Sequence, residues 1–250
     1  MPTLEAEAVV LRQYTLAEAD RIIVFFTREF GKVRAVAQGA KKPKSRLGAC
    51  LEPLTHVRIE YYAREGADLG RIHRCEIIHS YLGHGAGLDR VYGFIYFSEI
   101  VQEMVEDNNP NNLLFRLFIS VLNAGEALGI SEALVRYFEV WSLKLNGLLP
   151  DYGTCSVCGK CVIDFGFYAW LEAGQGCCAE CSGGRGLHVR SEAARVLQQV
   201  ATLSPRAFAS RPLDAQGAAD LERLIQKHFE WQLEKRLKSY SALREMLRSI

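Results

Sequence analysis

Two Cys-x-x-Cys pairs in the second half of the chain contain the residues best suited to chemistry. Cys155 and Cys158 form the first pair, and Cys178 and Cys181 form the second after nineteen intervening residues. Each pair can place two thiolates on one side of a metal ion, and two facing pairs complete a tetrahedral shell of four sulfur atoms. Because such a shell leaves no position for water or substrate, the spacing predicts one zinc ion that stabilises structure and takes no part in a reaction.

Two further cysteines, Cys161 and Cys177, leave the choice of ligands open. Cys161 follows Cys158 at the same spacing that separates Cys158 from Cys155. The alternative set of ligands is Cys158, Cys161, Cys178 and Cys181. We favour the set with Cys155, because residues 150–153, Pro-Asp-Tyr-Gly, are typical of a turn that delivers the first pair from a preceding helix.

A redox dithiol is the competing interpretation of the cysteines. Cys158 and Cys161 could form one, but a thioredoxin-like pair follows a strand in a βαβ unit, whereas this pair follows a predicted helix. Cys50 and Cys75 lie in strand-like sequence and are expected to be small buried hydrophobic residues. The sequence shows no apolar run of transmembrane length and no cleavable leader, which together with unpaired thiols predicts a cytoplasmic protein with no membrane contact.

Five segments rich in Val, Ile, Phe and Tyr precede the cysteines. The expected strands are Ala6–Leu11, Arg21–Thr27, Lys32–Gln38, Leu54–Tyr62 and Leu69–His79. The tightest joint between them is centred on Gly31, which predicts a hairpin of the second and third strands. Five strands within about 80 residues favour a closed OB-fold barrel over a sandwich, which usually needs about seven strands.

The hydrophobic pattern changes to a period of 3.6 residues between about Leu88 and Pro150, which predicts three helices. Ser131 is the expected N-cap of the third helix, and Ser191 is expected to cap a further helix after the cysteines. A long final helix is expected from about Ala218 to Arg248. These helices are expected to form one bundle, with the zinc module inserted between its third and fourth members.

The elements together predict an α+β multidomain chain with an N-terminal OB-fold barrel and a C-terminal helical bundle that holds a four-cysteine zinc module. The expected domains are an OB-fold DNA-binding domain at 1–80, a first helical part at 81–150, the zinc module at 151–186 and a second helical part at 187–250.

Basic residues gather in one stretch, although the whole chain has 30 Lys and Arg residues against 29 Asp and Glu residues. The stretch runs from the third strand into the joint after it, from which OB-fold loops reach single-stranded nucleic acid. Its cations would bind phosphates without reading base edges. The predicted DNA-binding residues are Lys32, Arg34, Lys41, Lys42, Lys44 and Arg46. The alternative is a solvated loop that only keeps the protein soluble.

Two pairs of adjacent aromatic residues lie in the second and fourth expected strands. Phe25 with Phe26, and Tyr61 with Tyr62, must each place one ring on the outer face if the strand is regular. An outward ring could stack on a base. We favour the other interpretation, in which the outward rings pack against the helices.

The sequence that leads into the first cysteine pair resembles a known family. Residues 137–151, Tyr-Phe-Glu-Val-Trp-Ser-Leu-Lys-Leu-Asn-Gly-Leu-Leu-Pro-Asp, run directly into Cys155. This stretch resembles RecO, the family of bacterial DNA repair and recombination mediators. Further similar stretches occur in the family's order at residues 7–12, 19–20, 27–32, 39–42 and 236–239. The resemblance covers nearly the whole chain and implies an OB-fold, a helical domain and a four-cysteine zinc module, although Cys161 and Cys177 depart from the family's four cysteines.

The resemblance also implies a function that the spacing of residues does not show. RecO-like proteins bind single- and double-stranded DNA, anneal complementary strands, work with RecR, and help to load RecA on DNA coated by single-stranded DNA-binding protein. This implies a nucleoid-associated protein that is not an enzyme, and the sequence agrees, since no Walker-type Gly-rich loop or ordered catalytic triad stands out. The alternative is a zinc-stabilised adaptor that binds protein partners and has little intrinsic DNA binding.

For some relatives the resemblance further implies a groove for the acidic, Phe-ended tail of single-stranded DNA-binding protein. Such a groove needs an apolar pocket rimmed by cations. The third helix offers Trp141 and Leu145 on its apolar stripe, with Arg136 and Lys144 beside it. The alternative interpretation of this stripe is ordinary protein core.

Overall fold

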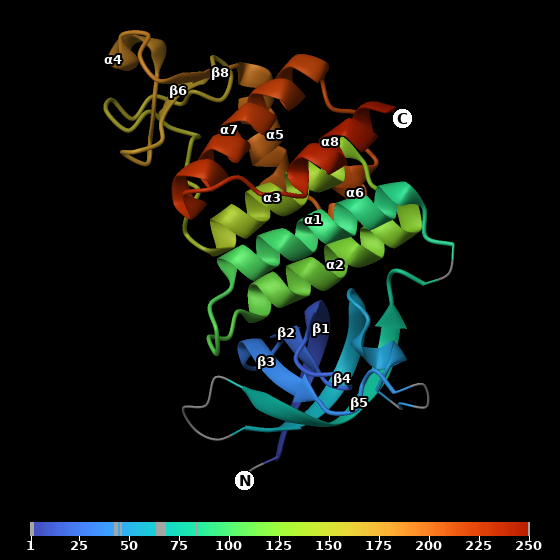
Figure 1. Ribbon diagram of the computed structural model, residues 1–250. Helices are drawn as coiled ribbons and strands as arrows, with labels where there is room; N and C mark the ends of the chain where they lie inside the picture. The colour runs from blue at the N-terminus through green and yellow to red at the C-terminus, as the bar shows by residue number, and fades with distance from the viewer. Residues whose placement is uncertain (1–2, 43–44, 46, 64–68, 84, 250) are drawn as a thin grey trace. The chain divides into compact units, whose positions relative to one another are not determined.

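A computed structural model describes residues 3–42, 45, 47–63, 69–83 and 85–249. The chain folds into two compact units, Met1–Ile119 and Ser120–Ile250. The first unit contains a closed five-stranded barrel, and the second contains helices and a small three-stranded sheet (Figure 1). The α+β class predicted from the sequence is therefore confirmed. No helix within the described ranges is both long enough and apolar enough to cross a membrane.

All five expected strands are present in the barrel. They are β1 (Thr3–Thr15), β2 (Arg21–Thr27), β3 (Gly31–Ala37), β4 (Thr55–Tyr62) and β5 (Gly70–Ser80). Neighbouring strands follow the order β1-β2-β3-β5-β4, and β1 also pairs with β4, so that the barrel closes. The pairing of β3 with β5 is parallel and joins Ala35 to Gly70 and Val36 to Arg71. The other four pairings are antiparallel.

Alternate side chains of the strands fill the barrel, as the two-residue period of a strand requires. Phe25 points inward and packs in one cluster with Val10 and Ile59. Phe26 is also fully buried, although it lies outside that cluster. Its ring centroid lies 5.4 Å from that of Phe115, a residue of helix α2 (Asn112–Leu128). The outward ring of this pair therefore packs against a helix, as expected.

The tyrosine pair of β4 divides differently. Tyr61 belongs to the barrel core, whereas Tyr62 is half-buried and its ring centroid lies 5.4 Å from that of His73 on β5. Tyr62 therefore packs against a neighbouring strand, and the expectation that it packs against a helix was wrong. Cys50, in the 3-10 turn Ala49–Leu51, and Cys75, on β5, both pack at the barrel core as small hydrophobic residues.

Helix α1 (Leu88–Met104) follows the barrel. The segment after it returns to the start of β3. Lys32 N donates to Glu106 O over 3.3 Å, and Asn108 N donates to Lys32 O over 3.0 Å. These backbone bonds tie the end of α1 to the hairpin that begins β3.

Five helices of the second unit lie outside the cysteine module and after α2. They are α3 (Glu132–Leu145), α5 (Ser191–Thr202), α6 (Pro205–Ala209), α7 (Ala215–Leu233) and α8 (Tyr240–Ser249). Ser131 caps α3 as predicted, because its side-chain oxygen accepts from Leu134 N over 3.2 Å. At α5 the prediction was one residue late, since Arg190 is the N-cap and Ser191 is the first helical residue.

The expected single final helix was wrong. Glu234 has a φ of 53°, a left-handed conformation that ends α7, and the chain starts again as α8 at Tyr240. A left-handed residue of this kind is a common end of a helix, although glycine usually occupies the position. Leu237 lies between the two helices and is itself buried. The hydrophobic pattern of the sequence therefore continues through the break.

Candidate metal centre and nucleic-acid interface

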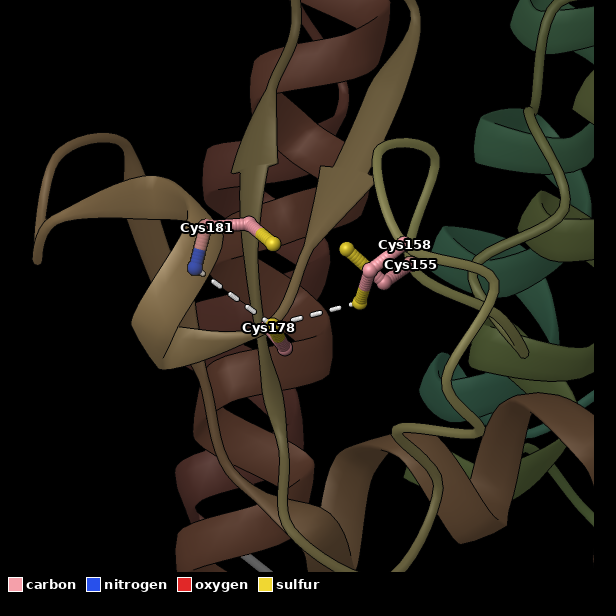
Figure 2. A group of neighbouring side chains, drawn as sticks. All are labelled: Cys155, Cys158, Cys178 and Cys181. Carbon is pink, nitrogen blue, oxygen red and sulfur yellow. Dashed lines mark hydrogen bonds between the residues drawn. The ribbon is translucent and has the colours of Figure 1, made fainter.

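The two cysteine pairs lie on a small framework between α3 and α5 in the chain. Strands β6 (Phe167–Trp170), β7 (Gln175–Cys177) and β8 (Leu187–Val189) form a sheet in the order β7-β6-β8. The first pair lies in the loop before this sheet. The second pair follows β7 directly, where Cys178 is the N-cap of the short helix α4 (Ala179–Ser182). The sheet therefore delivers one pair to face the other (Figure 2).

The four sulfur atoms are close enough to share one metal ion. Cys155, Cys158, Cys178 and Cys181 have Sγ atoms that all lie within 4.8 Å of one another. The Sγ atoms of Cys158 and Cys178 are 3.9 Å apart. Tetrahedral zinc with Zn–S bonds near 2.3 Å requires sulfur atoms about 3.8 Å apart. The arrangement therefore fits a four-sulfur metal site, which Figure 2 shows with the side chains converging.

Backbone N–H groups favour the thiolate forms that a metal needs. Hydrogen bonds from the backbone of Cys158 and then of Cys178 lower the pKa of Cys155 to about 6. Cys181 N points toward the sulfur of Cys178 over 3.5 Å. Donors directed at sulfur stabilise its negative charge, which favours the thiolate at Cys155. The pKa of Cys181 is instead raised, first of all by its side-chain hydrogen bond with Cys178.

The two extra cysteines lie outside this cluster. Cys161 is exposed and forms an isolated backbone bridge with Thr154, and it is not a member of the group of converging sulfur atoms. Cys177 is fully buried on β7, and its pKa is raised, first of all by burial. Of the two ligand sets that the spacing left open, the structure brings together the set that contains Cys155.

Tyr152 connects the first cysteine loop to a helix, and the sequence analysis did not identify this role. Its ring stacks on Phe167 with centroids 4.7 Å apart and planes at 11°. Its hydroxyl lies 2.7 Å from Nε2 of His228 on α7. Gly176 lies beside the ring, where an added Cβ would come within 2.6 Å of Tyr152 Cδ1. The contacts fix the approach of the loop that carries Cys155.

The predicted DNA-binding residues fall into two groups. Lys32 is largely buried, and its Nζ donates to Gln102 O over 3.0 Å and lies 3.4 Å from Asp107 Oδ1. Arg34 is half exposed, and its Nη2 lies 3.0 Å from Asp107 Oδ2. Lys41 and Lys42 are exposed in the turn after β3. The remaining two residues of the prediction, Lys44 and Arg46, lie outside the described residues.

The turn that carries Lys41 and Lys42 is attached to the connection between β1 and β2. Lys41 N donates to Ala19 O over 3.1 Å, and Gly39 N donates to Asp20 Oδ1 over 2.8 Å. Gly39 has a φ of 65°, which glycine adopts without strain. Two loops of the barrel thus hold each other in place and present the two lysines to solvent.

The third helix offers only one of the two cations that a groove there would use. Arg136 is buried, with 2% of its side chain exposed, and its Nη1 lies 2.7 Å from Glu139 Oε2 on the same helix. Trp141 donates its Nε1 proton to Val200 O over 3.0 Å, while Lys144 lies over the Trp141 ring. The Arg136 part of the prediction was wrong, because this guanidinium is enclosed in the protein and does not rim a groove.

Comparisons with known proteins cover nearly the whole chain. A family described as "Recombination protein O N terminal" matches residues 1–81, and one described as "Recombination protein O C terminal" matches residues 86–241. The DNA repair protein RecO of Koribacter versatilis (strain Ellin345) is 36% identical over 241 residues, which is 96% of this chain and 97% of the relative. The DNA repair protein RecO of Anaeromyxobacter dehalogenans (strain 2CP-C) is 30% identical over 98% of each chain. The chain therefore belongs to the RecO family of DNA repair and recombination proteins.

Proposed function

We propose that this chain is a non-enzymatic recombination mediator. It binds single- and double-stranded DNA, anneals complementary strands, and with RecR helps to load RecA on DNA coated by single-stranded DNA-binding protein. The observation that carries the proposal is the pair of exposed lysines, Lys41 and Lys42, on a turn fixed to the barrel. Exposed cations on a held turn can neutralise phosphates without first being ordered.

We further propose that the barrel is an OB-fold. An OB-fold is a five-stranded Greek-key barrel, and the closed order β1-β2-β3-β5-β4 supports that assignment. Its nucleic-acid surface lies on the loops and strands near β1 to β3, where the lysine turn meets the connection from β1 to β2. The domain boundaries that we propose are 1–80 for this barrel, 81–150 and 187–250 for the helical parts, and 151–186 for the metal module.

The cations of β3 contribute less to DNA binding under this proposal than those of the turn. Lys32 and Arg34 share Asp107, and breaking that arrangement to reach a phosphate would leave the carboxylate without its cations. Lys41 donates its Nζ proton to a backbone carbonyl, that of Ala17, over 3.4 Å. Its full positive charge remains available for a phosphate, so we assign the main phosphate contacts to Lys41 and Lys42.

A salt titration of binding to labelled single-stranded DNA tests the proposal. Each phosphate contact that is lost should reduce the magnitude of the salt slope by roughly 0.7 on a single strand. The Lys41→Glu/Lys42→Glu variant should bind more weakly at low salt and show a slope about 1.4 smaller. The control, Lys144→Glu/Lys160→Glu, has the same change in net charge on two exposed lysines elsewhere and should keep the slope. Equal losses in both variants would mean that only net charge matters.

We propose that the four-cysteine site holds one zinc ion with a structural role. The donor set consists of four sulfur atoms with no oxygen or nitrogen ligand, which suits zinc and leaves no coordination position open. Zinc bound by Cys155, Cys158, Cys178 and Cys181 would join the two loops of a module whose sheet has strands of only three or four residues. The chain's own residues then orient the loops, with Tyr152 and Phe167 packed beneath them.

A protein-binding adaptor is the second candidate function, and a groove between α7 and α8 favours it. The groove has a volume of about 1230 Å³ and is lined by Leu237, by seven cations and by four acidic residues, so its charge is net positive. Two of the cations, Arg223 and Arg236, pair with the groove's own Asp220 and Glu230, whereas Lys227 and Arg248 also line it. An acidic tail that ends in Phe, like that of single-stranded DNA-binding protein, has the complementary charge and an apolar end. We propose this groove, in place of the third helix, as the site for that tail.

Fluorescence anisotropy with a short acidic peptide separates the two functions. Binding of a Phe-ended peptide that is lost when the Phe is removed, and weakened by Lys227→Glu, would support the groove. A chain that binds this peptide but shows no affinity for DNA at low salt would be an adaptor. A chain that binds DNA but no peptide would act as a mediator through DNA and RecR contacts.

A further inference from the structure

An exposed aromatic residue, Tyr14, lies on the outer face of the barrel near the lysine turn. The strand register places Tyr14 of β1 opposite Ile22 of β2, and Ile22 opposite Val36 of β3. These positions alternate with Ile23 and Ala35, which point into the barrel. The side chain of Tyr14 therefore stands on the outside of the sheet, in one row with two half-buried apolar residues.

The row that contains Tyr14 is exposed, whereas helices cover the row at the other end of the same face. Val9 lies opposite Phe26 at the covered end, and both are fully buried. At the other end of β1, Tyr14 is 46% exposed. A ring with nearly half of its surface in solvent is available to a ligand, and its neighbours decide whether it can bind one.

One cation lies at the Tyr14 ring, and a second lies on the turn that adjoins its strand. Arg12, two residues earlier on the same face, has its Cζ 5.4 Å from the ring centroid and donates from Nη1 to the Tyr14 hydroxyl over 3.3 Å. Lys41 donates to Ala17 O, three residues after Tyr14 along the chain. One carboxylate of that connection, Asp20, accepts a hydrogen bond from Gly39 N. The exposed Glu18 is the other acidic residue of the connection.

An aromatic ring set among cations is the combination that binds single strands. Arginine and lysine attract the phosphates, while the ring face receives an unstacked base. The cation near the ring also adds to stacking through its own planar group. A duplex cannot use the ring in this way, because its bases are already stacked on one another.

We infer that Tyr14 is a stacking platform for one base of single-stranded DNA, with Arg12 orienting the ring and Lys41 and Lys42 holding the adjoining phosphates. The inference rests on the proposed DNA-binding function and adds to it a residue that distinguishes single from double strands. It also explains why a polar hydrogen bond fixes an otherwise exposed ring, since a ring held in place loses less freedom when a base binds.

The test compares strands with and without bases. The probes are a labelled oligothymidylate of about 16 nucleotides, near the upper site size of an OB-fold, an abasic strand of equal length, and a duplex. Tyr14→Leu in the full chain should weaken oligothymidylate binding by about tenfold or more and leave abasic and duplex binding unchanged. Tyr14→Phe should retain most of the affinity. Tyr92→Leu, which removes an exposed ring from α1, is the matched control and should change nothing.

The outcomes separate this inference from the function on which it rests. Unchanged oligothymidylate binding by Tyr14→Leu, while Lys41→Glu/Lys42→Glu weakens it, would overturn the stacking role alone. An equal loss on abasic and base-containing strands would overturn it too, because a damaged fold or a lost charge effect does not depend on bases. A wild-type chain that binds none of the three probes at low salt would overturn the proposed DNA binding itself.

Discussion

The hydroxyl of Tyr152 lies 2.7 Å from Nε2 of His228, which joins the first cysteine loop to helix α7. His228 is almost fully buried, and burial lowers its pKa from 6.5 to about 4. The contact between Tyr152 and His228 therefore holds the cysteine loop against α7 while the imidazole of His228 is neutral.

Stability should fall as the pH decreases from 6.5 to 4. The unfolded chain takes up a proton at His228 near pH 6.5, whereas the folded chain does so only near pH 4. The unfolded state binds more protons in that window, so the free energy of unfolding should decrease by about 3 kcal/mol across it. Urea unfolding at several pH values measures this decrease.

The His228→Gln variant isolates this effect from other groups that titrate in the same window. Its free energy of unfolding should depend less on pH than that of the wild type, by about the same 3 kcal/mol. His188→Gln removes an exposed histidine of the same module and should keep the wild-type dependence. Parallel curves for wild type and His228→Gln would refute the assignment.

Removing a predicted metal ligand should release the metal and destabilise the module. Metal binding contributes on the order of 10 kcal/mol to the folding of small zinc modules, so Cys155→Ser or Cys178→Ser should lower the melting temperature and the solubility. Metal analysis of the wild type should give one zinc per chain. Cys161→Ser is the matched control and should retain the metal, because Cys161 lies outside the sulfur cluster. Metal loss in Cys161→Ser and not in Cys155→Ser would reverse the choice of ligands.

Breaking the buried ion pair of α3 should be costly. Arg136 Nη1 and Glu139 Oε2 are 2.7 Å apart, with 2% and 0% of their side chains exposed. Arg136→Met removes a cation from the buried Glu139 carboxylate and should lower the free energy of unfolding by about 3–5 kcal/mol. Arg136→Met/Glu139→Leu should recover most of that loss, since the carboxylate is removed together with its cation.

The exposed pair of Arg195 and Asp164 provides the comparison for the buried one. Its atoms are 3.2 Å apart, with 51% and 69% of the side chains exposed. Asp164→Ala should cost less than about 1 kcal/mol, because water screens the two charges. Chemical denaturation of Arg136→Met and Asp164→Ala measures the two losses in the free energy of unfolding. Similar losses would show that burial does not control the strength of the Arg136 pair.

Gly31 should tolerate substitution much less than Gly147, although both have a φ of 69°. A Cβ at Gly31 would lie 2.0 Å from Asn109 O, whereas a Cβ at Gly147 meets nothing within 4 Å. Both alanine variants carry the backbone strain of about 1 kcal/mol, but only Gly31→Ala must also displace the backbone after α1. Thermal melts should show the larger decrease for Gly31→Ala, and equal decreases would mean that the close approach is unimportant.

The elements of the barrel could be predicted because local patterns determine them. Segments rich in Val, Ile, Phe and Tyr predicted all five strands, and Gly31 predicted the hairpin of β2 and β3. The end of α7 could not be predicted, because Glu234 adopts a left-handed conformation that Gly or Asn usually occupies at the end of a helix. Leu237 preserved the helical period across the break and concealed it.

The cysteine cluster could be predicted from spacing, whereas the fate of the charged residues could not. Four thiols in two pairs have few geometries, so the sulfur atoms converge as expected. Arg136 and Lys32 are cations whose partners decide their roles. Arg136 meets Glu139 one turn along α3, and Lys32 meets Asp107 from a distant segment. Tyr14 was missed because it stands alone in the sequence and only the strand register shows that it faces outward.

The parallel contact of β3 with β5 makes one side of the barrel different from the rest. The antiparallel pairings extend over several residues each, but this seam joins two residue pairs, beginning with Ala35 and Gly70. Loop-closure entropy opposes the pairing of segments that are distant in sequence. We therefore expect β3 to pair with β5 after the local hairpin of β2 and β3 has formed. The same seam holds its two strands by the fewest paired residues, so it is the part of the barrel wall with the least backbone pairing, whereas the β1–β2–β3 ribbon is paired along its length.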